Sequence, residues 1–236
     1  MKLRYFSDLH LEFIKPNKLK HFINKIPPGL DEICILAGDI GNPYKLQYDT
    51  FMNFMSKNFK KTFVIAGNHE YYNKKKMIYE TDAFLEEYFE QFDNISFLNN
   101  QYEIYENYCF IGTTLWSKIT NPLYKINDAY QIPNFDHIQY NELNDECVDF
   151  LKNALKENEN CIVITHHLPS NSLVHTKYKT PDMLPYNQWY YCDMDELIDT
   201  NREKIKCWFY GHTHIPSDGI INDIPFLCNP IGYPNE

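Results

Sequence analysis

The segment Phe63-Val64-Ile65-Ala66-Gly67-Asn68-His69-Glu70 runs directly from an apolar stretch into a polar cluster. A short run that is apolar at every position is typical of a strand buried on both faces. In an α/β sheet, ligands bind in the crevice outside the carboxyl ends of the strands. This segment therefore predicts a buried strand that delivers polar side chains to a candidate site.

Four other apolar runs end in the same manner. The polar sequences that follow them are Asp8-Leu9-His10, Gly38-Asp39, Thr165-His166-His167 and Gly211-His212-Thr213-His214. The strands predicted from all five runs cover residues 3–7, 33–37, 62–66, 161–165 and 206–210. Five such strand ends would bring Asp, Asn and His to one edge, where metals that favour oxygen and nitrogen ligands could bind. Glycines before three of these side chains permit sharp turns.

The segments between the strands predict helices and hairpins. Apolar residues recur at helical spacing in residues 51–59, 77–92 and 143–155. Alternation of strands and helices predicts an α/β fold with parallel pairing. Residues 101–115 and 218–228 read instead as antiparallel hairpins. We therefore expect mixed sheets, two of which pack together.

Size and composition restrict the class of protein. The 236 residues are enough for one sizeable domain, which we expect to span residues 1–236. A formal net charge of −10 argues against a nucleic-acid partner. Seven scattered cysteines predict reduced thiols, and hence a cytoplasmic protein. Apolar stretches of membrane-spanning length are absent from the sequence, so no membrane partner is expected.

The five polar motifs, in this order, resemble those of the calcineurin-like metallophosphoesterase superfamily. The resemblance covers residues 7–214, nearly the whole chain. It implies a four-layer α/β/β/α sandwich of two mixed sheets, with a dinuclear metal site at the carboxyl ends of the strands.

The resemblance also implies the ligands of two divalent or trivalent metal ions, of which Mn, Fe, Zn, Ni and Co all suit such a donor set. The first ion would be held by Asp8, His10, Asp39 and His214. The second would be held by Asp39, Asn68, His166 and His212, with Asp39 bridging the two. His166 is preferred over His167 because it has the same place after its apolar run as Asp39 and Asn68 have after theirs. His167 is then assigned to substrate binding, with packing as the alternative.

Two metals would generate a bridging hydroxide that attacks phosphorus in line. By resemblance, His69 faces the substrate and stabilises the transition state or protonates the leaving oxygen. Glu70 either orients His69 or caps the following helix.

The implied function is hydrolysis of a small phosphomonoester or phosphodiester, for which a nucleotide-like molecule is one candidate. The Ser/Thr protein phosphatase branch is disfavoured, since Arg4 and Arg202 lie outside the positions of its phosphate-binding arginines. The alternative is a catalytically silent scaffold or binding protein on the same fold. The complete ligand set and His69 favour the enzyme, and oligomeric state is not encoded in any readable pattern.

Residues 168–192 form a long segment rich in Pro, Asn and Tyr, directly after His166. Segments of this length in compact domains are often functional. The aromatic residues Tyr178, Tyr186, Trp189 and Tyr190 could stack on a base or sugar. We expect this segment to form one wall of the substrate pocket, the alternative being a surface excursion that its aromatic residues anchor.

Overall fold

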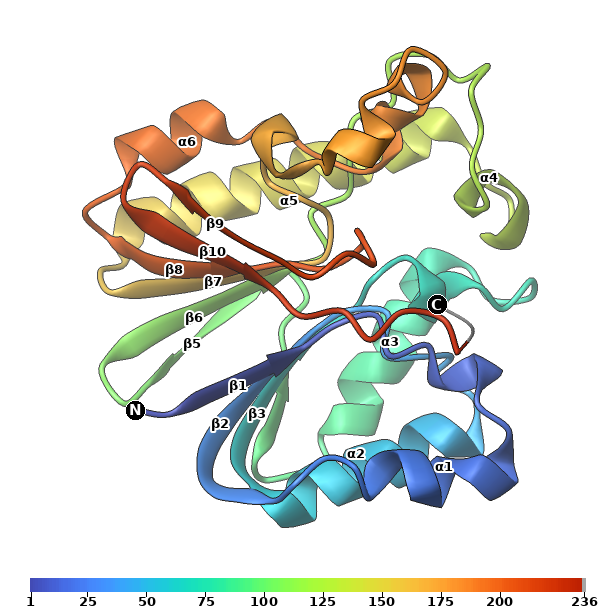
Figure 1. Cartoon of the computed structure of the whole chain (residues 1–236), viewed down its shortest axis with the longest axis vertical. Helices are drawn as coiled ribbons and strands as arrows, with labels where there is room; N and C mark the ends of the chain where they lie inside the picture. Colours follow the sequence, from blue (N-terminus) through green and yellow to red (C-terminus); the bar gives the residue numbers. More distant parts are fainter. Residues whose placement is uncertain (235–236) are drawn as a thin grey trace.

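In the computed structural model, which describes residues 1–234, two β-sheets pack face to face between two layers of helices (Figure 1). The first sheet has strand order β1-β2-β3-β4, and the second has β5-β6-β7-β8-β10-β9. The strands are β1 (Leu3–Phe6), β2 (Gly29–Ala37), β3 (Phe59–Ile65), β4 (Ile95–Phe97), β5 (Gln101–Tyr105), β6 (Tyr108–Thr113), β7 (Cys161–Thr165), β8 (Ile205–Phe209), β9 (Ser217–Ile221) and β10 (Ile224–Cys228). The predicted α/β/β/α architecture is confirmed.

Helices α1 to α3 cover the outer face of the first sheet, and α5 and α6 cover that of the second (Figure 1). The α-helices are α1 (Pro16–Ile23), α2 (Leu46–Asn58), α3 (Ile78–Phe89), α4 (Asp128–Gln131), α5 (His137–Glu157) and α6 (Asp195–Thr200). The short 3-10 helices are η1 (Leu11–Phe13), η2 (His69–Tyr71), η3 (Asn171–Leu173), η4 (Thr176–Tyr178) and η5 (Leu184–Trp189). Within residues 1–234, none of the helices combines the length and apolar character needed to cross a membrane.

The expected mixture of strand directions is found in the second sheet. Its hairpins β5–β6 and β9–β10 are antiparallel, while β6, β7, β8 and β10 pair in parallel. The turns at Glu106-Asn107 and Asn222-Asp223 have positive φ at both residues, as two-residue hairpins of type I′ require. In the first sheet the described pairs are all parallel, because a helix crosses over between each strand and the next.

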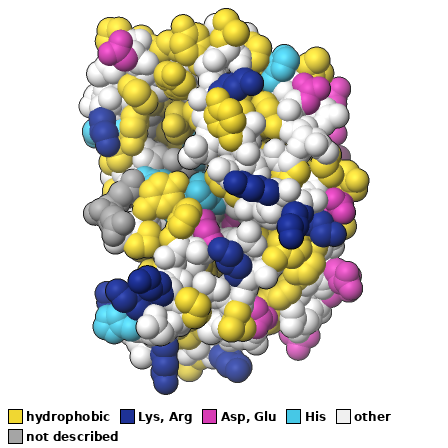
Figure 2. Space-filling view, turned by 90° about the vertical axis from the view of Figure 1, so that its right-hand side faces the viewer, with side chains coloured by type: hydrophobic (Ala, Val, Ile, Leu, Met, Phe, Trp, Pro, Cys, Tyr) yellow, Lys and Arg dark blue, Asp and Glu magenta, His cyan; other side chains and the backbone are white. Residues whose placement is uncertain are grey.

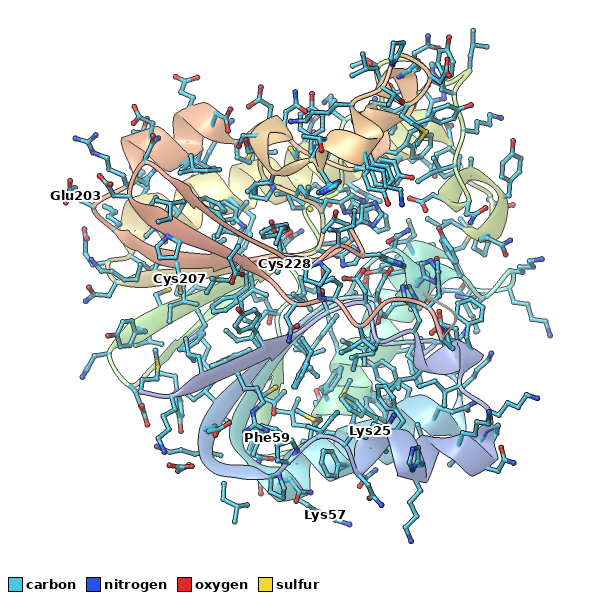
Figure 3. All side chains as sticks on the ribbon, in the orientation of Figure 1. Lys25, Lys57, Phe59, Glu203, Cys207 and Cys228 are labelled. Atoms are coloured by element: carbon cyan, nitrogen blue, oxygen red, sulfur yellow. The ribbon has the colours of Figure 1, made fainter. Side chains whose placement is uncertain are left out.

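Alternating side chains of the buried strands supply two different cores. Ile33 and Ile35 of β2 point into the core between the sheets, whereas Cys34 and Leu36 point toward the helices. Side chains fill the space between the two sheets (Figure 3). Phe63 stacks on Phe110 across this space, with ring centroids 4.1 Å apart. Burial on both faces explains why these strands are apolar throughout.

The structure and the sequence prediction agree most closely at the strands. β7 has the predicted bounds, Cys161–Thr165, and β1, β3 and β8 differ from theirs by a few residues. β2 begins at Gly29 rather than at residue 33. α1, α6 and β4 were not predicted, because each is short and has no extended apolar pattern.

Candidate metal centre and active site

All seven predicted metal ligands lie at the carboxyl ends of five strands, where the two sheets meet. Asp8 and His10 follow β1, Asp39 follows β2, Asn68 follows β3, His166 follows β7, and His212 and His214 follow β8. Six of the seven are buried, and His214 is half-buried. Because the first sheet supplies some of these side chains and the second sheet supplies the others, the site depends on the packing of one sheet against the other.

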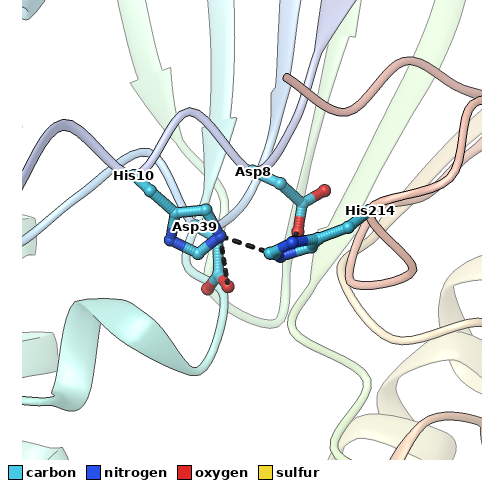
Figure 4. A group of neighbouring side chains, drawn as sticks. All are labelled: Asp8, His10, Asp39 and His214. Atoms are coloured by element: carbon cyan, nitrogen blue, oxygen red, sulfur yellow. Dashed lines mark hydrogen bonds and ion pairs between the residues drawn. The ribbon is translucent and has the colours of Figure 1, made fainter. Parts of the chain in front are cut away.

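The first group consists of Asp8, His10, Asp39 and His214, whose polar ends point toward one another (Figure 4). Nε2 of His10 lies 2.9 Å from Nε2 of His214 and 3.8 Å from Oδ2 of Asp39. Nε2 of His214 lies 3.5 Å from Oδ1 of Asp8. Two carboxylates and two imidazoles converging in this way form a donor set suited to a cation such as Mn, Fe or Zn.

The second group consists of Asp39, Asn68, His166 and His212. Nε2 of His166 lies 3.0 Å from Oδ1 of Asn68, 3.4 Å from Oδ1 of Asp39 and 3.2 Å from Nδ1 of His212. Burial lowers the pKa of His166, but the carboxylates of Asp39 and Asp8 outweigh it and raise this pKa to about 10. An environment that attracts a proton so strongly also attracts a metal cation, which would compete with that proton.

The two adjacent histidines have different surroundings in the structure. Nδ1 of His166 donates to the carbonyl of Ala37 at 2.9 Å, which directs its Nε2 into the second group. His167 is fully buried, and its Nδ1 lies 3.2 Å from the carbonyl oxygen of Thr114. Burial lowers the pKa of His167 to about 3, so its ring is neutral. Its ring packs behind His212, with centroids 4.4 Å apart. Packing, the alternative from the sequence, therefore fits His167 better than substrate binding.

Five of the seven predicted ligands have a left-handed backbone conformation. They are Asp8 (φ 53°), His10 (46°), Asp39 (53°), His212 (68°) and His214 (50°). For residues other than glycine this conformation is uncommon and costs about 1–3 kcal/mol each. Strain of this kind concentrates at functional sites, so the backbone supports the assignment independently of side-chain chemistry.

Glu70 has a role that differs from both sequence interpretations. Its buried carboxylate accepts hydrogen bonds from the backbone N–H groups of Asp39 (3.1 Å), Ile40 (2.8 Å), Gly41 (3.2 Å) and Gly67 (2.7 Å). It therefore ties the loop after β2 to the loop after β3. Glu70 neither orients His69 nor caps the helix, because the four amide groups occupy both of its oxygens.

Gly67 is required where these two loops meet. A Cβ atom at this position would lie 2.2 Å from Oδ1 of Asp39 and 2.7 Å from Cε1 of His166. Any other residue would therefore displace two of the predicted ligands. The lack of a side chain at Gly67 thus permits the close approach of the two loops.

Glu12, to which the sequence assigned no role, is the partner of His69. Its Oε1 lies 2.9 Å from Nδ1 of His69 and 3.3 Å from Nδ1 of His10. Burial lowers the pKa of His69, but Asp39 and Glu12 outweigh it and raise this pKa to about 9. On the other side of the ring, Nε2 of His69 lies 3.2 Å from the hydroxyl oxygen of Tyr233.

Asp128 is a second supporting residue that no sequence motif marks. Its buried carboxylate accepts hydrogen bonds from Nδ2 of Asn68 at 2.8 Å and from the hydroxyl group of Tyr72. Because the amide nitrogen of Asn68 is held in this way, its Oδ1 is directed toward His166. Asp128 lies sixty positions from Asn68 in the sequence, so only the fold connects them.

A cavity of about 210 Å³ opens above the two ligand groups, and we call it the inner cavity. Among its lining residues are Asp39, Asn68, His69, His212 and His214. Leu168, Val174, Tyr178 and Tyr190 of the long segment form one of its walls. The long segment therefore contributes to this cavity as expected.

Two aromatic residues of that segment are placed differently from the expectation. Trp189 is fully buried, its ring packs on Phe135 and Tyr140, and its Nε1 donates to the carbonyl of Tyr124. The ring of Tyr186 also packs against Tyr124. These two side chains anchor the segment, while other residues of it face the inner cavity.

Comparison with known proteins agrees with this geometry. Residues 1–216 match the family model described as calcineurin-like phosphoesterase. The chain belongs to this family. A relative from Acanthamoeba polyphaga mimivirus, named "Uncharacterized protein L509", is 33% identical, and the match covers 99% of this chain and 92% of the relative.

Two solved structures resemble the fold of this calcineurin-like phosphoesterase. The phosphopantetheinyl hydrolase from Mycobacterium tuberculosis has a TM-score of 0.80 at 15% identity, covering 99% of this chain and 90% of that one. A putative 5′-nucleotidase from Staphylococcus aureus has a TM-score of 0.52 at 14% identity, covering 98% and 48%. At these identities the likeness concerns the fold alone.

Proposed function

We propose that this metal-dependent phosphoesterase hydrolyses a phosphomonoester or phosphodiester of a small substrate, and that it uses two metal ions held by the two ligand groups. The observation that carries the proposal is the position of Asp39. Its Oδ2 faces His10 of the first group, and its Oδ1 faces His166 of the second. A carboxylate shared in this way is suited to bridge two cations.

Two metal ions bound there would acidify a water held between them and bind the phosphate oxygens. The residues of the chain then have separate tasks. Glu70 and Gly67 hold the loops that carry Asp39 and Asn68 together. Glu12 orients His69, which lines the inner cavity and is placed to donate a proton to the leaving oxygen.

The proposal extends to the organisation and location of the chain. Residues 1–236 are proposed to act as one domain, because the ligand groups need both sheets. The cysteines are all free thiols, among them Cys207 and Cys228, which lie on neighbouring strands (Figure 3). Free thiols support a reducing, cytoplasmic location.

The proposal is tested by a screen of the purified protein. The protein is stripped with a chelator, reconstituted separately with Mn, Fe, Zn, Ni or Co, and assayed with p-nitrophenyl phosphate, bis(p-nitrophenyl) phosphate and nucleotides. We expect turnover that requires metal and two metal ions per chain by elemental analysis. Metal binding without turnover of any ester would support the scaffold alternative instead.

Replacing Glu12 by Ala is expected to lower kcat about 10- to 100-fold, because His69 loses the carboxylate that fixes its ring. Glu12→Gln keeps an oxygen that can accept a hydrogen bond, so we expect a smaller loss. Steady-state kinetics at saturating metal measure both effects. KM should change little, since Glu12 is proposed to act through His69.

Glu203→Ala serves as the control, because this glutamate is 90% exposed and lies far from the site (Figure 3). Metal content is measured for each variant, since Glu12 also lies close to His10. If Glu12→Ala kept full kcat with full metal content, Glu12 would not be a positioning residue.

A further inference from the structure

A second, more open hollow adjoins the inner cavity. It has a volume of about 960 Å³, and Lys15, Lys18 and Lys45 are among its lining residues. We call it the lysine groove. His69 and Tyr72 line both the inner cavity and the lysine groove. The proposed proton donor therefore stands where the two spaces meet.

Among the residues that the structure describes, carboxylates do not neutralise the three lysines that line the groove. Elsewhere, Lys61 pairs with Glu103 and Lys204 pairs with Glu159. Within residues 1–234, Lys15, Lys18 and Lys45 form no ion pair, although Lys45 Nζ donates to the backbone carbonyl of Glu12 at 3.4 Å.

Among residues 1–234, Glu12 is the acidic side chain that lines the groove, and its Oε1 is directed to His69 and His10. Figure 2 shows Lys and Arg side chains around a hollow in which His and acidic side chains are visible. The groove thus presents positive charge to a ligand in a chain whose formal net charge is −10.

The inner cavity differs from the lysine groove in the side chains that line it. Tyr178 and Tyr190 line it with nearly parallel rings, 9° apart in orientation, beside the apolar side chains of Leu168 and Val174. It suits an uncharged or aromatic substituent. The two adjoining spaces therefore offer room for two chemically different groups of one phosphate ester bound at the ligand groups.

We propose that the substrate is a phosphodiester with one alcohol group in the inner cavity and a second alcohol group, bearing a further phosphate-like anion, in the lysine groove. This inference rests on the proposed function. In the reaction, the oxygen of water loses a proton to solvent and bonds to phosphorus, while the bond from phosphorus to the oxygen of the anionic alcohol breaks. That alcohol leaves with a proton from His69, and the products are a phosphomonoester and the anionic alcohol. A monoester would leave one of the two spaces empty.

The test uses two synthetic diesters that differ in one group. Both are p-nitrobenzyl esters; the second alcohol is 3-phosphopropanol in one and 1,3-propanediol in the other. Formation of p-nitrobenzyl phosphate is followed by chromatography. We expect kcat/KM to be about tenfold higher for the 3-phosphopropanol diester than for the 1,3-propanediol diester. This preference should decrease as salt is added.

The double variant Lys15→Gln/Lys45→Gln should abolish most of that preference, because kcat/KM should fall much more for the diester with the second phosphate than for the hydroxypropyl diester. Its matched control is Lys25→Gln/Lys57→Gln, which removes the same charge near the opposite ends of α1 and α2 (Figure 3). The control should keep the preference. Adding Lys18→Gln to the double variant should remove the rest of the preference for the diester with the second phosphate.

Equal kcat/KM for the two diesters in the unmodified protein, or an unchanged preference in the double variant, would overturn the proposal. Hydrolysis of p-nitrophenyl phosphate without hydrolysis of either diester would also overturn it, while the phosphoesterase function would stand. Loss of turnover of every phosphate ester would instead contradict the proposed function. Melting temperatures identify any variant that fails to fold, and the single lysine variants then replace it.

Discussion

Replacing Asp39 by Asn is expected to remove bound metal from both ligand groups and to lower kcat/KM by about a thousandfold or more. The reason is its shared position, with one carboxylate oxygen directed to each group. Asn keeps the size of the side chain and an oxygen that can accept from the backbone N–H of His69, so the loop should retain its shape. What would be lost is the negative charge between the two proposed cations.

Metal content and thermal stability measure this effect without relying on activity. A metal that binds only the folded protein raises the melting temperature, so added Mn or Zn should stabilise the unmodified protein much more than Asp39→Asn. Asp145→Asn is the control, because Asp145 pairs with Lys118 at the surface. Two metals per chain in Asp39→Asn would rule out the bridging role.

Replacing His69 by Ala is expected to lower kcat about 10²- to 10⁴-fold while metal content stays close to that of the unmodified protein. His69 lines both the inner cavity and the lysine groove, and its ring is held between Glu12 and Tyr233. It therefore lies at the boundary of the two hollows and outside both groups of four proposed ligands. The substitution should therefore slow the chemical step of the reaction.

Substrates with different leaving groups test whether His69 donates a proton. A p-nitrophenol leaving group needs little help from an acid, whereas an alkyl alcohol needs a proton. The fall in kcat caused by His69→Ala should therefore be several times larger for the p-nitrobenzyl diesters, which release an alkyl alcohol, than for bis(p-nitrophenyl) phosphate. Equal falls in kcat for the two kinds of substrate would argue against proton donation by His69. Loss of metal as complete as in Asp39→Asn would indicate that His69 is a metal ligand. His21→Ala, on the exposed side of α1, is the control.

Much of the candidate site could be predicted because its residues are local to strand ends. Asp39 follows β2 and Asn68 follows β3, and parallel neighbours in a sheet end at the same edge. His166 follows β7 in the other sheet, and its Nδ1 reaches the carbonyl of Ala37 at the end of β2. The pairing of the strands therefore brings side chains that are far apart in the sequence together at one edge.

The supporting residues could not be predicted in the same way. The sequence suggests that Glu70 orients His69 or caps the following helix, yet its carboxylate accepts hydrogen bonds from the amides of the neighbouring loop. The sequence leaves open whether Trp189 lines the pocket or anchors the segment, and in the structure it is fully buried and does not line the inner cavity. Composition indicates that a side chain can stack or accept hydrogen bonds, but not which neighbour it meets.

The sequence by itself determined the fold class and the set of side chains that meet at the sheet edge, because strand periodicity and the polar residues that end each strand are local properties. Only the tertiary structure decided that Glu12 holds His69, that Asp128 directs Asn68, and that the inner cavity adjoins the lysine groove. These contacts join residues far apart in the chain. Their geometry is set by how the two sheets and the long connecting segment pack, and such packing has no local signature.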